Sequence, residues 1–230
     1  MNSYPIEIID GIFCVGGPDL SHPQDALSYL VIGEESSALI DCGAGEGAEV
    51  IWDNIDKAGL NPEDLTYIIL THGHVDHIGG AGYFKERTQA HLVAHALDQE
   101  AIESGDPVFT AAGWYGVRLP SLKIDRVQRA RQEELNLGPN DKIVCLHTPG
   151  HTPGSISVYI DRKEERVLFG QDIHGPFSQA FRSNLNDWDN STKELMDLNA
   201  DILCEGHFGV YRPSKVVRTY IDRFRQQFLS

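Results

Sequence analysis

Apolar and polar positions along the chain predict an alternation of short strands and helices. Residues 6–9 and 12–16 are strand-like segments joined by Asp10-Gly11, a sequence typical of tight hairpins. Together with residues 27–32 and 38–41, they predict an antiparallel meander at the start of the chain. Further apolar or β-branched segments that predict strands lie at residues 65–70, 90–94, 142–146, 155–160, 166–170 and 202–204.

Apolar residues recur at helical spacing between these segments. Residues 46–58 carry one apolar stripe and are followed by Gly59, which favours the end of a helix. The last helix is expected after Pro213, because the fixed φ of proline suits a first helical turn. Shorter helices are expected near residues 81–85, 97–103, 124–135 and 192–198. This alternation is compatible with sheets that are covered by helices.

The size and charge of the chain limit the classes of function. Its 230 residues, 41% of them hydrophobic, are enough for one large core, so we expect residues 1–230 to form a single domain. The net charge of −15 repels a phosphate backbone. The basic residues of segment 126–131 are expected on a solvated helix face. We therefore expect no nucleic-acid partner.

The sequence also bears on location and redox state. No apolar run approaches membrane-spanning length and the first residues lack the pattern of a signal peptide, so we expect a cytoplasmic protein without a membrane partner. The four cysteines lie in or beside predicted strands and are expected to be reduced and buried. They are Cys14, Cys42, Cys145 and Cys204. The sequence does not indicate an oligomeric state.

The segment 71–80 carries the densest group of metal-binding residue types. Three histidines and one aspartate fall within six residues, at His72, His74, Asp76 and His77. Imidazole nitrogens and carboxylate oxygens are the usual ligands of zinc, and they also suit iron or manganese. No single helix or strand points these four positions at one small volume, so we expect a loop. The first pair would hold one ion and the second pair another.

Two ions need more ligands than these four residues supply. Further histidines or aspartates are therefore expected at the ends of later strands, and His151, Asp172 and His207 occupy such positions. His151 lies in a segment with two prolines and two glycines between residues 149 and 154, which favours a rigid turn. A rigid turn holds a ligand side chain in place.

The motif at residues 72–77 resembles the H-x-H-x-D-H signature of the metallo-β-lactamase superfamily of metallohydrolases. The resemblance continues, in the family's order, through residues 39–43, 147–155, 170–172 and 205–207. It covers most of the chain and is specific for the superfamily, but only weakly specific for a substrate. It implies a four-layer αββα sandwich, with two mixed sheets face to face and helices outside.

The resemblance also implies two divalent metal ions, with zinc favoured and iron or manganese open. Six residues match the family's terminal ligands and a seventh, Asp172, matches the bridging carboxylate. The six are His72, His74 and His151 on one ion, and Asp76, His77 and His207 on the other. Two such ions would activate a bridging hydroxide for attack on a carbonyl or phosphoryl centre. Asp76 would also hold the hydroxide and move protons.

Other polar residues lie near these segments. Asp41 is expected to orient a metal-bound imidazole, as the resemblance implies. His174 is a candidate catalytic residue that contacts the substrate, with simple packing as the alternative. His91, His95 and His147 are expected to be scaffold or surface residues, because the ligand set closes without them.

Residues 96–142 are expected to contain an insertion that covers the substrate, because long segments without structure of their own are usually functional. Within it, Trp114 and Tyr115 would line a substrate pocket or pack on the surface of the insertion. Tyr211 lies between a candidate ligand and the last helix, where it would reach the substrate.

The resemblance favours hydrolysis of a small ester, thioester, lactone or phosphoester. His77 and the carboxylate of Asp172 argue against a true β-lactamase. Only 23 residues follow His207, too few for the helical C-terminal domain of glyoxalase II-type thioesterases. An iron-dependent oxidoreductase on the same fold, with sulfur or oxygen chemistry, is the alternative. Flavodiiron proteins share the fold but replace the second histidine with a carboxylate, whereas this chain keeps His74. A binding protein without turnover is a third possibility, against which the complete ligand set speaks.

Overall fold

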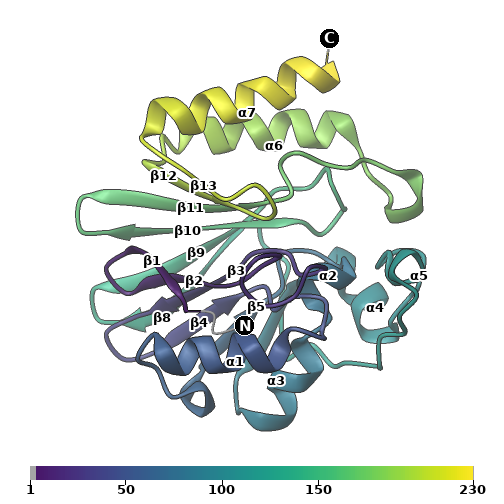
Figure 1. Cartoon of the computed structure of the whole chain (residues 1–230). Helices are drawn as coiled ribbons and strands as arrows, with labels where there is room; N and C mark the ends of the chain where they lie inside the picture. Colours follow the sequence, from purple (N-terminus) through teal and green to yellow (C-terminus); the bar gives the residue numbers. More distant parts are fainter. Residues whose placement is uncertain (1–3, 230) are drawn as a thin grey trace.

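The computed structural model describes residues 4–229 and arranges them in four layers (Figure 1). Two sheets face each other in the middle. Helices α1 (Ala48–Lys57) and α3 (Ala81–Arg87) cover the outer face of the first sheet, and α6 (Leu185–Asp197) and α7 (Ser214–Leu229) cover that of the second. The predicted αββα sandwich is confirmed.

The first sheet has seven strands in sequence order. The first four are antiparallel neighbours, which confirms the predicted meander, and the next three continue parallel to the fourth. The strands are β1 (Ile6–Ile9), β2 (Ile12–Gly16), β3 (Ser28–Ile32), β4 (Ser37–Ile40), β5 (Tyr67–Ile69), β6 (His91–His95) and β7 (Arg126–Gln128). Because β4 to β7 are parallel, their carboxyl ends meet at one edge of the sandwich.

The second sheet has six strands in the order β13-β12-β11-β10-β9-β8. All neighbours are antiparallel except β11 and β12, which run parallel and end together. The strands are β8 (Gln132–Gly138), β9 (Asp141–His147), β10 (Ile156–Arg162), β11 (Glu165–Gln171), β12 (Ile202–Glu205) and β13 (Val210–Tyr211). The shared end of β11 and β12 delivers Asp172 and His207 to the same place.

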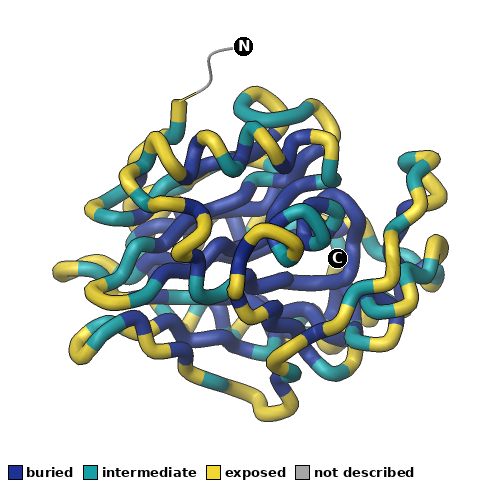
Figure 2. Tube along the Cα trace, turned by 90° about the horizontal axis from the view of Figure 1, so that it is seen from below, coloured by how far each residue is buried: buried dark blue, intermediate teal, exposed yellow. Residues whose placement is uncertain are grey.

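The main core lies between the two sheets, where inward-facing residues of both are buried (Figure 2). Tyr29 of β3 and Phe169 of β11 make an aromatic contact across this interface, with ring centroids 5.4 Å apart. All four cysteines are buried and free, as predicted. No helix among residues 4–229 has the length and apolar character needed to cross a membrane.

The remaining helices are short. They are α2 (Val75–Ile78), α4 (Ala96–Ser104), α5 (Ala112–Tyr115) and the two 3-10 turns Pro62–Asp64 and Gln179–Phe181. Helix α4 confirms the helix predicted at residues 97–103. Helix α6 starts seven residues before the predicted position, because the side chain of Asn184 caps it by accepting hydrogen bonds from the amides of Asn186 and Asp187.

The helix predicted for residues 124–135 is wrong, because this segment contains β7 and the first part of β8. In β8 the buried residues Leu135 and Leu137 alternate with the exposed residues Glu134 and Asn136. This period of two is that of a strand with one buried face. The basic residues of the segment therefore lie on and between two edge strands and not on a helix face.

Phe169 is fully buried between the two sheets, so its removal should leave a cavity there. We expect Phe169→Ala to lower the free energy of unfolding by about 3–5 kcal/mol, measured by urea denaturation. Val216→Ala, at an exposed position of α7, should change it by less than about 0.5 kcal/mol. Equal effects of the two substitutions would contradict the assignment of the core.

Candidate metal centre

The candidate ligands converge at the edge of the sandwich where the parallel strands end. The segment after β5 carries His72 and His74 and continues into α2, which carries Asp76 and His77. The expectation of a loop is therefore only half right, because the last two residues occupy one helical turn. His151 arrives from the turn after β9, while the remaining two candidates follow β11 and β12.

The first group of side chains surrounds a space the size of one ion. Nε2 of His72 lies 3.1 Å from Nδ1 of His74, which lies 2.9 Å from Nε2 of His151. Oδ2 of Asp172 lies 3.4 Å from Nε2 of His151 and 3.8 Å from Nε2 of His72. A tetrahedral zinc site with bonds of about 2.0–2.1 Å places its ligand atoms about 3.3 Å apart. The observed spacing fits that geometry.

The second group lies beside the first and shares the carboxylate. Nε2 of His77 lies 3.3 Å from Nε2 of His207 and 3.9 Å from Oδ2 of Asp76, and the latter two atoms are 3.4 Å apart. Oδ1 of Asp172 lies 3.2 Å from His77 Nε2 and 3.3 Å from His207 Nε2. Asp172 thus turns one oxygen toward each group.

The environment of these groups fits a cation. The three histidines of the first group, and His77 and Asp172, are all buried. Among the described residues, Oδ1 of Asp172 has no hydrogen-bond partner. A buried carboxylate oxygen without a partner is costly. A divalent cation facing this oxygen would remove that cost, and the neighbouring imidazoles are the nitrogen ligands that such cations accept.

Three of the imidazoles are oriented by oxygen atoms that contact their Nδ1 atoms. Nδ1 of His77 donates to Oδ2 of Asp41 over 2.7 Å, and Nδ1 of His151 donates to the carbonyl oxygen of Pro176 over 2.8 Å. Nδ1 of His72 lies 3.1 Å from the hydroxyl of Thr71. Such contacts fix the ring orientation of metal-bound histidines. The contact expected of Asp41 is therefore present.

The charges of the two groups differ in the metal-free protein. Burial holds the pKa of His72 and His74 well below the usual range and lowers that of His151 to about 4, so these rings are neutral ligands at pH 7. Burial also acts to lower the pKa of His77. The carboxylates of Asp172 and then Asp41 outweigh it and hold the pKa well above 6.5.

His174 lies beside the second group and is held by the carboxylate of Glu205, a residue to which the sequence motifs assign no role. Its Nδ1 lies 2.7 Å from Oε1 of the fully buried Glu205. The other oxygen of Glu205 accepts hydrogen bonds from the amides of His207 and Phe208. The only sequence signal for Glu205 is its position two residues before a candidate ligand.

His174 differs in placement from the seven candidate ligands. One ring nitrogen lies within 4.8 Å of ligand atoms of Asp172 and His207, but it does not join the group formed by Asp76 and His77. His174 is therefore at the edge of the centre and partly accessible.

Aromatic side chains lie near the ligand groups. The buried ring of Phe181 packs 4.4 Å from the ring of His74, and Trp114 of α5 packs 5.8 Å from Phe181 while 66% of its surface stays exposed. Burial and then the carboxylate of Asp76 raise the pKa of Tyr115.

Two further aromatic residues follow His207 in the chain. The exposed ring of Phe208 packs 4.7 Å from His174. Tyr211 instead packs on Tyr220 of α7, with ring centroids 4.2 Å apart, and its hydroxyl donates to the carbonyl of Phe208. Tyr211 therefore packs on the helix layer, and this contact explains the placement of its side chain without a substrate.

The histidines expected as scaffold or surface residues lie outside the metal groups. The ring of His95 stacks on that of His147 with centroids 3.7 Å apart, and both pKa values are lowered by burial. His91 is exposed at the start of β6. The structure therefore agrees with the expectation for all three.

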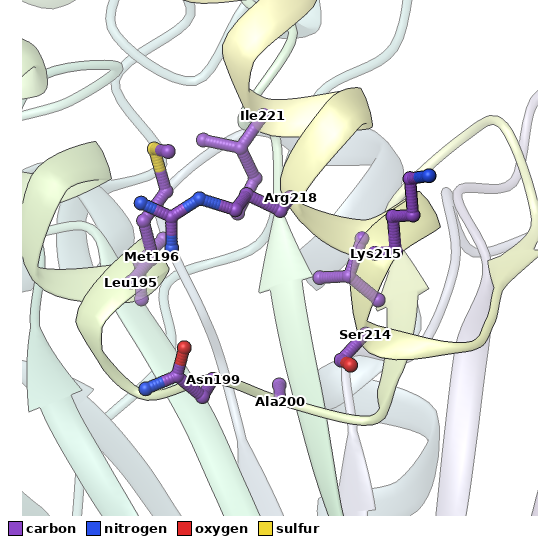
Figure 3. A pocket seen from close by; sticks show the side chains of 9 residues that line it. Leu195, Met196, Asn199, Ala200, Ser214, Lys215, Arg218 and Ile221 are labelled. Atoms are coloured by element: carbon purple, nitrogen blue, oxygen red, sulfur yellow. The ribbon is translucent and has the colours of Figure 1, made fainter.

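A hollow between α6 and α7 is formed by other residues (Figure 3). It has a volume of about 220 Å³ and is lined by apolar side chains such as Leu195 and Ile221, together with Lys215 and Arg218. None of its lining residues belongs to the histidine and aspartate groups. It therefore lies outside the candidate metal centre.

Comparison with known proteins gives a family for this geometry. The sequence model of the metallo-beta-lactamase superfamily matches residues 23–207, a range that contains every candidate ligand. The solved structures with similar folds include a HARLDQ motif mutant of a metallo-beta-lactamase from Cronobacter sakazakii. It has a TM-score of 0.82 and 21% identity, with 98% of this chain and 95% of that chain covered. At this identity the likeness shows a shared fold only.

The names of two relatives state a hydrolase and a thioesterase activity. The chain is 32% identical over 162 residues to hydroxyacylglutathione hydrolase GloC of Haemophilus influenzae, with 65% of this chain and 66% of the relative covered. It is 27% identical over 238 residues to acyl-coenzyme A thioesterase MBLAC2 of Gallus gallus, with 90% of this chain and 81% of the relative covered.

The raised pKa of His77 predicts that metal binding releases protons. At pH 7 the metal-free ring is protonated, whereas a ligand must be neutral, so an ion displaces the proton. We expect the release to decrease as the pH rises through the pKa of His77. Calorimetric titration with zinc in two buffers of different ionisation enthalpy measures it.

Asp41→Asn should reduce the release at pH 7, because it removes one of the carboxylates that raise this pKa. The control is Asp125→Asn. The carboxylate of Asp125 accepts hydrogen bonds from Lys85 and from the amide of Leu92, and its replacement should leave the proton release unchanged. Zinc binding without proton release at pH 7 would contradict the charge state derived for His77.

Proposed function

Because the chain belongs to the metallo-β-lactamase superfamily, we propose that it is a metal-dependent hydrolase with a two-ion centre. One observation carries the proposal. Asp172 presents one carboxylate oxygen to each of two adjacent ligand groups, and these oxygens lie 3.2–3.8 Å from the facing imidazole nitrogens. A single buried carboxylate in this position suits a bridging ligand.

The two groups would divide the ions between them, with zinc as the preferred metal because imidazole-rich sites with this spacing suit it. The first ion would be held by His72, His74 and His151, the second by Asp76, His77 and His207, with Asp172 on both. Bound there, the ions would supply a water molecule of lowered pKa and a positive charge that polarises the substrate.

The protein's own residues would orient the reactants. Asp76 would hold the attacking water through the carboxylate oxygen that does not face His207 and would take up its proton. Glu205 contacts Nδ1 of His174 and would hold the ring so that its other nitrogen could hydrogen-bond with the substrate. We propose Asp76 and His174 as catalytic residues.

We propose a small thioester or ester as the substrate. The names of the two relatives support thioesters, and the exposed rings of Trp114 and Phe208 near the centre suit an apolar acyl group. The covering segment within residues 96–142 would be the part between α4 and β7, which includes α5, because the rest forms strands of the two sheets. We also propose a cytoplasmic location and, given the net charge of −15, no nucleic-acid partner.

A panel of four substrates tests the reaction class: a thioester, a lactone, a phosphodiester and a β-lactam. We expect the metal-loaded protein to hydrolyse the thioester fastest. Asp172→Ala should lower kcat/KM by more than about a hundredfold and lower the bound metal. A variant that keeps two ions and full activity would refute the bridging role.

Absence of turnover for all four substrates, with both ions bound, would refute the proposed class. Iron content and oxygen consumption would then become the relevant measurements.

The role of His174 is tested by His174→Asn. We expect kcat for the thioester to fall by about 10²-fold or more, with two ions still bound, because the side chain would act on the substrate and not on the metal. Tyr211→Phe serves as the matched control and should keep kcat within about twofold, since the ring of Tyr211 packs on Tyr220 and its hydroxyl donates to the backbone carbonyl of Phe208. Loss of an ion from His174→Asn would show instead that His174 is a ligand.

A further inference from the structure

A buried carboxylate joins the two loops that carry the first ligand group. Asp98 is the third residue of α4 and is only 1% exposed. Its Oδ2 accepts hydrogen bonds from the amide of Gly73 over 3.0 Å and from the hydroxyl of Thr152 over 2.6 Å. Its Oδ1 accepts from the amide of Gly154 over 2.7 Å.

Two of the three partners of this carboxylate are immediate neighbours of candidate ligands in the chain. Gly73 stands between His72 and His74, and Thr152 directly follows His151. The two loops come from different sheets, since one follows β5 and the other follows β9. Asp98 thus spans the interface between the segments whose three imidazoles must converge on one ion.

The fit between Asp98 and the second loop is close. A Cβ atom added to Gly154 would lie 2.5 Å from Oδ1 of Asp98, nearer than real Cβ contacts occur. Glycine at this position therefore lets the backbone approach the carboxylate. The start of α4 also fixes Asp98, because the side chain of His95 caps the helix by accepting from the amide of Leu97.

The second ligand group has a matching carboxylate. Asp41 accepts hydrogen bonds from the amide and the hydroxyl of Thr71, each over 2.8 Å, and from Nδ1 of His77. Asp41 therefore holds a ligand ring directly. Asp98 makes the same number of bonds but reaches only the backbone and one hydroxyl beside the ligands, so it acts on the loops and not on the rings.

We propose that Asp98 is the positioning residue of the first ion, setting the distance between the loop of His72 and His74 and the loop of His151. This inference rests on the two-ion centre proposed above. Without the carboxylate, two buried amides and one buried hydroxyl lose their acceptor, and the loops must shift to satisfy them. The three imidazole nitrogens would then no longer converge, and the first ion would bind more weakly.

Single-ion variants separate the two groups. His207→Ala leaves the first group intact, and His151→Ala leaves the second intact. We expect Asp98→Asn to weaken zinc binding about 10- to 100-fold in the His207→Ala background and by less than about twofold in the His151→Ala background. Competition with a chromophoric chelator measures each affinity. Asparagine keeps the shape of the side chain but replaces one acceptor oxygen with an amide group, which cannot accept.

Two further sets of variants distinguish positioning from a general loss of stability. In the His207→Ala background, Thr152→Val should weaken zinc binding and Thr152→Ser should restore it, because serine keeps the hydroxyl that donates to Asp98. This pair also gives the test if Asp98→Asn fails to fold. Asp125→Asn removes another acceptor of a backbone amide near β6, and it should leave zinc affinity unchanged even where it lowers the unfolding midpoint.

Equal weakening in both backgrounds, or no weakening in either, would overturn the role of Asp98. Equal zinc affinities of the Thr152→Val and Thr152→Ser variants would overturn it as well. A parent protein that binds a single zinc ion would overturn the two-ion centre first, and the inference about Asp98 with it. The parent titration therefore separates failure of the proposed function from failure of this inference.

Discussion

The burial of one carboxylate among five imidazoles determines the properties of the candidate metal centre. Asp172 is buried against His77 and His207 on one side and faces the first group on the other, and its Oδ1 has no hydrogen-bond partner among the described residues. Burial acts to raise its pKa, but the two facing histidines hold it well below the usual range. A buried carboxylate oxygen without a hydrogen-bond partner is costly for a fold. A bound cation would offset this cost, and the imidazoles around the carboxylate are suitable ligands for it.

The sandwich makes this concentration of charge possible. The parallel strands of the first sheet bring Asp41 and the segment 71–77 to one edge, and the parallel pair β11 and β12 brings Asp172 and Glu205 to the same edge. Contacts from outside the ligand set, such as Asp41 on His77 and Glu205 on His174, then fix ring orientations. The centre is therefore a product of strand direction in both sheets, and the surrounding carboxylates refine it.

Much of this arrangement is encoded locally and was predictable. The spacing of residues 72–77 identified a metal-binding motif, and the segments that end at Asp172 and His207 had clear strand patterns. The error at residues 124–135 has a physical cause, since β7 has only three residues and β8 begins with three polar residues, so that the apolar alternation of β8 starts only at Leu135, where the predicted helix ends. The sequence does not indicate the roles of Asp98 and Glu205, because the role of a carboxylate depends on its partners. These partners are distant in the chain, with Thr152 for Asp98 and His174 for Glu205.

The division of the strands between the two sheets has a consequence for how the molecule is assembled. Every strand of the first sheet lies before residue 129 and every strand of the second lies after residue 131, so the chain consists of two consecutive halves. The first half supplies His72, His74, Asp76 and His77, and the second supplies His151, Asp172 and His207. An ion bound by residues of both halves would therefore stabilise their association, in addition to the core that lies between the two sheets. Two separately synthesised fragments, divided at residue 130, would reassociate more tightly with metal than without it.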